Sequence, residues 1–198
     1  MGRPRLFDER QAVAAACRVF WTKGYDGTTT EDLCEATGLG RSSIYNTFKS
    51  KPDLFRRSLE YYVDTMTDRQ VSVLRDETVD APERIRRLLA VIVDDEMNNR
   101  REGYGAGCFT VNTITGLTSK DTDVAEILDR DLERRLDSLR SLLVLGKADG
   151  SITSHLDADG LAWYLVSVIY GMRVSAQSGV DEPVLRQITD ATLAALTC

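Results

Sequence analysis

The stretch TTEDLCEATGLGRSSIYNTF, residues 29–48, decides the fold of the N-terminal part of this chain. Its first Thr and the Asp three positions later have the spacing of a capping box, which predicts a short helix over residues 29–36. The glycines within residues 38–40 then turn the chain. A second short helix is predicted over residues 41–48.

The second predicted helix offers mostly polar side chains. Ile44 and Phe48 are left to pack, and short donors near the start of such a helix can reach base edges in a DNA major groove. The free N–H groups at the Thr29 helix start can bind a phosphate. Two short helices at a glycine turn therefore predict a DNA-binding helix-turn-helix, with a solvated helix pair as the alternative. The candidate contacts on the second helix are Arg41, Ser42, Ser43, Tyr45, Asn46 and Thr47.

The formal charge divides unevenly along the chain. The 198 residues carry a net charge of −6, but residues 1–58 carry +3 and the remaining residues carry −9. A basic N-terminal part on an acidic body fits contact with a polyanion through the N-terminal part alone. With 42% hydrophobic and 28% charged residues, the composition is that of a soluble globular protein.

Apolar residues recur at helical spacing through nearly the whole chain, and no convincing alternating strand pattern is present. We therefore predict an all-α fold of about nine helices. Helix starts are predicted at Asp8, Thr29, Ser50, Asp80, Asp121 and Asp157, with a last helix near Pro183. The helix over residues 157–178 is apolar on nearly every side, so we expect a second subunit to cover it, at Val168 or Ile169.

Membrane and secretion signals are not found in the sequence. The longest nearly unbroken apolar run, Leu161–Met172, has 12 residues, whereas a membrane span needs about 20. The first ten residues are charged and have no apolar stretch behind them, unlike a secretion signal. We expect a cytoplasmic protein.

Cysteine and histidine usage argues against a disulfide framework, a zinc or histidine-based metal site and a Ser-His-Asp triad. The four cysteines have no CxxC spacing, and His155 is the single histidine. We expect no cofactor and no catalysis. A helical scaffold that binds only protein remains an alternative.

Residues 7–55 resemble the N-terminal domain of the TetR family of bacterial transcriptional regulators. The resemblance runs through Ala16–Phe20, Gly24–Thr30, Asp32–Gly38, Ser43–Phe48 and Lys51–Phe55. It implies a homodimer that binds a palindromic operator and is released by a small molecule. It further implies a three-helix DNA-binding domain over residues 1–50 and a helical ligand-binding and dimerisation domain over residues 51–198. Carried over by position, Thr29, Tyr45, Asn46 and Lys51 fall where the family contacts phosphates.

Aromatic, sulfur and amide side chains in the second part could line an effector cavity between helices. Each of them taken alone is more often ordinary core than a ligand contact, because such stripes fill helical bundles. The candidate ligand-binding residues are Tyr62, Met66, Met97, Tyr104, Cys108, Phe109, Asn112, Trp163 and Tyr170.

Cys108 supports two further hypotheses. The segment Gly107–Asn112 resembles a Gly-Cys-x-x-x-Asn segment in a subgroup of TetR regulators, some of which sense electrophiles through that cysteine. The same thiol could be the nucleophile of a small helical enzyme, which would need a general base. A buried, inert cysteine is the alternative, since no Lys, Arg or His stands within five residues of Cys108.

Overall fold

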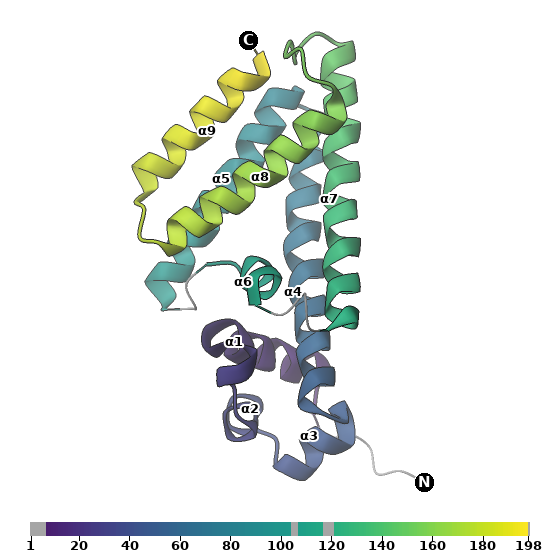
Figure 1. Ribbon diagram of the computed structural model, residues 1–198, viewed down its shortest axis with the longest axis vertical. Helices are drawn as coiled ribbons and strands as arrows, with labels where there is room; N and C mark the ends of the chain where they lie inside the picture. The colour runs from purple at the N-terminus through teal and green to yellow at the C-terminus, as the bar shows by residue number, and fades with distance from the viewer. Residues whose placement is uncertain (1–6, 104–106, 117–120, 198) are drawn as a thin grey trace.

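The computed structural model describes residues 7–103, 107–116 and 121–197, and every regular element within these ranges is an α-helix (Figure 1). The helices are α1 (Glu9–Gly27), α2 (Thr30–Thr37), α3 (Arg41–Phe48), α4 (Lys51–Leu74), α5 (Ala81–Glu102), α6 (Phe109–Gly116), α7 (Thr122–Ala148), α8 (Ala158–Gln177) and α9 (Glu182–Thr197). Helices α1–α3 form a head at one end, and α4 runs from the head into a body made of α4–α9 (Figure 1). The predicted all-α architecture is confirmed.

Most helices begin where the sequence predicts, because a short polar side chain accepts a hydrogen bond from backbone N–H groups of the first turn. These N-cap residues are Asp8, Thr29, Ser50, Asp80, Asp121 and Asp157. Helix α1 is interrupted at Gly24, whose backbone (φ 72°, ψ 170°) leaves the helical region. A break is predicted there by the glycine after Lys23.

Head and body share one hydrophobic core at their junction. The ring of Phe20 on α1 packs edge-on against Phe55 on α4, with 5.1 Å between centroids, and Phe55 packs in the same way against Phe109 on α6 at 5.6 Å. A second cluster joins α5, α7, α8 and α9 around residues such as Ile92 and Leu165. The division of the chain at residue 50 stays a prediction.

Helix α8 is less uniformly buried than its composition suggests. Ile169 is only 2% exposed and packs in the core of the protomer, so it does not face a partner as expected. Trp163 and Val174 lie exposed on the other side of α8, and Val184 lies exposed on α9. Within the described ranges, no helix is both long and apolar enough to cross a membrane.

Candidate functional site

The two helices of the predicted helix-turn-helix are set by hydrogen bonds at the start of α2. The Asp32 N–H donates to Thr29 Oγ1 at 3.1 Å, and the Thr29 N–H donates to Asp32 Oδ2 at 2.8 Å. This is the predicted capping box. Lys23 Nζ also donates to Asp32 Oδ1 at 2.6 Å, which ties α1 to α2. Gly38, with φ 67°, ends α2 in the left-handed conformation that glycine favours.

Helix α3 presents the polar face that the sequence predicts. Ile44 is 2% exposed and Phe48 is fully buried, so these two side chains fix the helix on the head. The exposed side chains are Arg41, Ser42, Ser43, Tyr45 and Asn46, and Thr47 is half-buried. Helix α3 lies at the end of the molecule opposite α9 (Figure 1), where a DNA duplex can approach it.

Arg41 and Tyr45 make only weak or local contacts with the protein. Arg41 Nη2 lies 3.5 Å from Glu31 Oε1, and both side chains are largely exposed. Because exposed ion pairs contribute little, Arg41 can exchange Glu31 for a nucleic-acid acceptor. The Tyr45 hydroxyl lies 3.2 Å from Thr30 Oγ1, so the start of α2 orients this phenol.

Two lysines flank the turn between α3 and α4. The Lys51 ammonium sits 4.5 Å from the centroid of the Tyr25 ring, a cation–π contact that holds it at the head's surface. Lys49 is exposed and has φ 58°, unusual for a residue other than glycine. Lys49 is not among the residues that the sequence predicts to contact phosphates. The cation itself, one residue after Phe48, was the available signal.

A buried polar cluster lies inside the body where α4, α5, α6 and α8 meet; we call Tyr62, Glu96, Cys108 and Arg173 the sensor core. The Tyr62 hydroxyl donates to Cys108 Sγ at 3.5 Å. Arg173 Nη1 donates to Glu96 Oε1 at 2.6 Å, and both side chains are less than 5% exposed. Three of these four residues come from helices far apart in sequence.

Arg173 supplies the cation that Cys108 lacks among its sequence neighbours. Burial lowers the pKa of the Arg173 guanidinium, but the nearby Cys108, Tyr62 and Glu96 more than offset this and hold that pKa above its ordinary value. Burial, followed by the charge of Cys108, raises the pKa of the Tyr62 phenol well above 10. No basic residue stands within five positions of Cys108 in the sequence, and the fold brings Arg173 near it.

A second buried polar group adjoins Tyr170, another candidate ligand residue. The Tyr170 hydroxyl accepts from Arg135 Nη2 at 2.7 Å, and Arg135 Nη2 pairs with Asp131 Oδ2 at 3.0 Å. Arg135 Nε is buried and has no hydrogen-bond partner among the residues that the structure describes. Such an orphaned donor is uncommon in a folded core.

The nine candidate ligand residues do not line one cavity. Tyr62, Cys108 and Phe109 lie together, and Met66 packs against the same hydrophobic cluster. Trp163 is 44% exposed. It lies 14 residues before Gln177, which lines the same cavity as Phe109, so these two α8 residues are roughly 21 Å apart along the helix. Met97 packs against the other cluster, and Tyr104 lies outside the described residues. Trp163 therefore lies away from the cluster that holds Tyr62 and Phe109.

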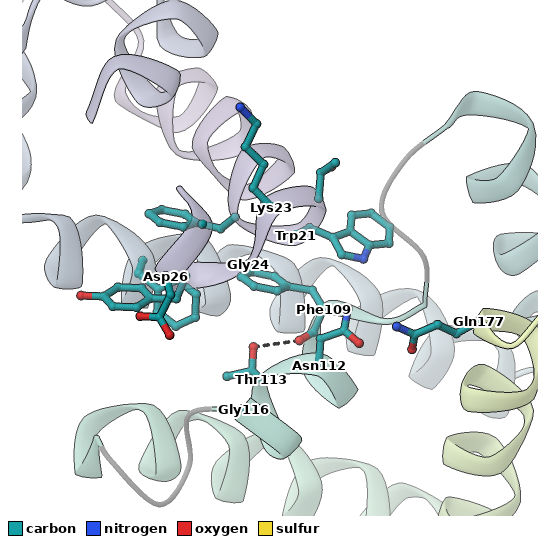
Figure 2. Close-up of a pocket in the computed structure, with 14 residues that line it drawn as sticks. Trp21, Lys23, Gly24, Asp26, Phe109, Asn112, Thr113, Gly116 and Gln177 are labelled. Carbon is teal, nitrogen blue, oxygen red and sulfur yellow. Dashed lines mark hydrogen bonds between the residues drawn. The ribbon is translucent and has the colours of Figure 1, made fainter. Parts of the chain in front are cut away.

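An open cavity of about 450 Å³ lies between the end of α1 and α6, and Figure 2 shows its lining. Asn112, a candidate ligand residue, lies on its α6 wall next to Phe109. Thr113 Oγ1 is not free to bind a ligand as a donor, because it donates to the Phe109 carbonyl at 2.8 Å. Trp21 and Gln177 are on the opposite side of Phe109 from Asp26 (Figure 2).

An exposed polar helix held on a helix-turn-helix head, joined by one long helix to a helical body, defines a DNA-binding transcriptional regulator. Residues 12–57 match the family model of bacterial regulatory proteins of the tetR family, and residues 81–192 match the model of the tetracyclin repressor-like C-terminal domain. The chain belongs to the TetR family of bacterial regulatory proteins. This membership removes the enzyme alternative.

Two relatives resemble the chain over nearly its full length. The HTH-type transcriptional repressor ComR of Escherichia coli (strain K12) is 32% identical over 97% of this chain and 90% of its own length. The uncharacterized HTH-type transcriptional regulator YezE of Bacillus subtilis (strain 168) is 26% identical over 99% of this chain and 100% of its own.

Solved structures share the fold. A cysteine mutant of the TetR family transcriptional regulator CifR, complexed with 26bp double-strand operator DNA, has a TM-score of 0.83 and 29% identity, covering 98% of this chain and 99% of its own. The reduced form of E. coli NemR has a TM-score of 0.78 and 19% identity, covering 93% and 95%. NemR is similar in fold.

Proposed function

We propose that this protein is a homodimeric transcriptional repressor of the cytoplasm that binds a palindromic operator through α3 and is released by a small molecule. The observation that carries the proposal is the face of α3, where the apolar Ile44 and Phe48 are buried and the hydrogen-bonding side chains are exposed. ComR, a relative over nearly the whole chain, is named a repressor, and CifR was solved with operator DNA.

On the operator, each head places α3 in a major groove. Arg41, Ser42 and Ser43 at the helix start face base edges, where an arginine can bind guanine in bidentate fashion. Thr29, Tyr45, Asn46 and Lys51 contact phosphates and fix the register of the helix. Thr47 supports these contacts from the next turn of α3.

The dimer forms through the exposed sides of α8 and α9. Trp163, Val174 and Val184 are large apolar side chains with substantial exposure in the isolated protomer. A two-fold partner would cover them with its own α8 and α9. Two heads would then read half-sites roughly 34–36 Å apart in successive major grooves.

Selection from a pool of random DNA duplexes tests this function and finds the operator sequence in the same experiment. We expect the purified protein to enrich an inverted repeat, and the enriched DNA to bind two protomers. A protein that enriches no sequence at physiological salt would refute the proposal.

A second candidate function is favoured by the sensor core: release through modification of Cys108. Its thiol accepts from Tyr62 at 3.5 Å and stands near the permanent charge of Arg173. The Cys108 sulfur would add to one carbon of the electrophile's carbon–carbon double bond, whose π bond breaks, and the proton lost by the thiol would pass through water to the other carbon. Alkylation with N-ethylmaleimide should then release the operator from the wild-type protein.

A further inference from the structure

The head is attached to the body by a second contact besides α4. The Trp21 indole Nε1–H on α1 donates to the Gly107 carbonyl, just before α6, at 2.9 Å. The two residues are 86 positions apart, and the bond is partly buried. Figure 2 shows Trp21 reaching from α1 toward the chain that leads into α6.

The side chain of Gln177, at the end of α8, packs closely against Gly107. Its φ of 84° lies in the region that favours glycine, and a Cβ at this position would come within 2.7 Å of Gln177 Cδ. The residue that accepts the Trp21 bond therefore lies in contact with the C-terminal end of α8, a helix of the body.

The residue after Gly107 belongs to the sensor core. Cys108 accepts from the Tyr62 hydroxyl, and the Tyr62 ring packs against the Trp21 ring with 5.3 Å between centroids. Tyr62 also packs edge-on against Phe109 at 5.5 Å. Within the short segment 107–109, Cys108 thus contacts the interior of the body, and its neighbour Gly107 contacts the head.

On the head side, Trp21 stands three residues before the break in α1. Gly24 leaves the helical conformation, and the chain then leads into the capping box of α2. Trp21 therefore anchors the last regular turn of α1 before the helix-turn-helix.

We infer that Trp21 is the positioning residue through which the body sets the orientation of the DNA-binding head, by its hydrogen bond to Gly107. The inference rests on the proposed function, because orientation matters only where two heads bind two half-sites. Displacement of segment 107–109 moves α1 directly, without a tilt of α4. The bond also narrows the range of head spacings that the free dimer samples.

The experiment compares the wild-type protein with Trp21→Phe, which keeps a ring beside Tyr62 but removes the indole donor. Affinity is measured for the selected operator, for the same operator with one base pair inserted at its centre, and for a half-site. One base pair turns and shifts the half-sites without changing any contact. We expect the preference for native spacing to fall about fivefold or more in Trp21→Phe, while half-site affinity stays within about twofold.

Tyr61→Phe is the matched control, since it removes a hydroxyl from a half-buried α4 ring near the head, and its spacing preference should equal that of the wild type. Unchanged spacing preference in Trp21→Phe would overturn the inference.

Amide hydrogen exchange of the free proteins supplies a second test that needs no DNA. We expect about tenfold faster exchange confined to α1 and α6. Equal exchange in the two proteins would overturn the inference, as would an acceleration spread equally over α8 and α9. Failure to select any operator would refute the proposed function instead.

Discussion

The Tyr62 hydroxyl on α4 donates to the Cys108 thiol at 3.5 Å, although the two residues stand 46 positions apart. Tyr62 lies on the helix that begins directly behind α3, and Cys108 directly precedes α6. A group added to the buried thiol would disturb its hydrogen bond with Tyr62. The sensor core is thus linked to the head in two ways. Tyr62 lies on α4, which follows α3 directly in the chain, and the Tyr62 ring also contacts Trp21 of the head.

Substitution of Cys108 by Ser distinguishes release of the operator by a non-covalent ligand from release by modification of the Cys108 thiol. N-ethylmaleimide should free the operator from the wild-type protein and fail on Cys108→Ser, because the hydroxyl is a poor nucleophile. Cys34→Ser, at a half-buried cysteine of α2, is the control and should respond like the wild type. Band-shift assays give the readout. If N-ethylmaleimide released the operator from Cys108→Ser as it does from the wild type, the reactive sensor would lie elsewhere. If Cys108→Ser instead lost its response to every inducer, a non-covalent ligand pocket would be excluded.

Breaking the buried Glu96–Arg173 pair should destabilise the fold strongly. Glu96→Gln leaves an arginine charge buried without its partner, which costs about 3–5 kcal/mol of unfolding free energy. The double variant Glu96→Leu/Arg173→Met should lose much less, because no charge remains buried. Asp94→Asn, in the exposed pair with Arg186, should cost less than about 1 kcal/mol. Urea unfolding at one fixed protein concentration measures all three, and equal losses in both single variants would contradict the argument.

Two substitutions on the head distinguish base recognition from phosphate contact. Arg41→Ala should cost about 1–3 kcal/mol on the selected operator if the guanidinium binds a guanine. Lys51→Ala should weaken binding to all sequences alike and reduce the salt slope by about one. Arg130→Ala, an exposed cation of the body, is the control. Unchanged affinity in both head variants at physiological salt would refute the proposed face.

Charge placed on α8 tests the dimer interface. Val174→Glu puts a carboxylate on an exposed apolar side chain, so we expect folded monomers by light scattering. Ile169→Glu should unfold the protein instead, because that side chain is buried within the protomer. Val144→Glu, on an exposed position of α7, should remain dimeric. A Val174→Glu protein that stays dimeric would place the interface elsewhere.

The capping box makes the head sensitive to acid. Hydrogen bonds from Lys23 and then Thr29 lower the pKa of Asp32 from 3.8 to about 2. Since the pKa is depressed on folding, this contribution is complete above about pH 4 and is lost as pH falls toward about 2. Thermal melts should show Asp32→Asn below the wild type at pH 6, with the difference closing near pH 2. A constant difference across this range would contradict the assignment, and Asp26→Asn is the exposed control.

Local sequence signals were sufficient for the helices and for the candidate DNA-binding face. The residues that cap a helix and those that end it lie within a few positions of each other, so Thr29 with Asp32, or Gly38, can be read directly from the chain. The burial of Ile44 and Phe48 follows from helical periodicity in the same way. Both depend on interactions within one turn, which the order of residues determines.

The surroundings of the candidate ligand-binding residues in the body could be established only from the tertiary structure. Whether Trp163 lines a cavity, and whether Cys108 meets a cation, depends on how α8 crosses α6, which no local spacing encodes. Arg173 reaches Glu96, and Trp21 reaches Gly107, across separations far longer than any helical repeat. Periodicity assigns a side chain to the buried face of its helix. Only packing between helices decides which other buried side chain it meets.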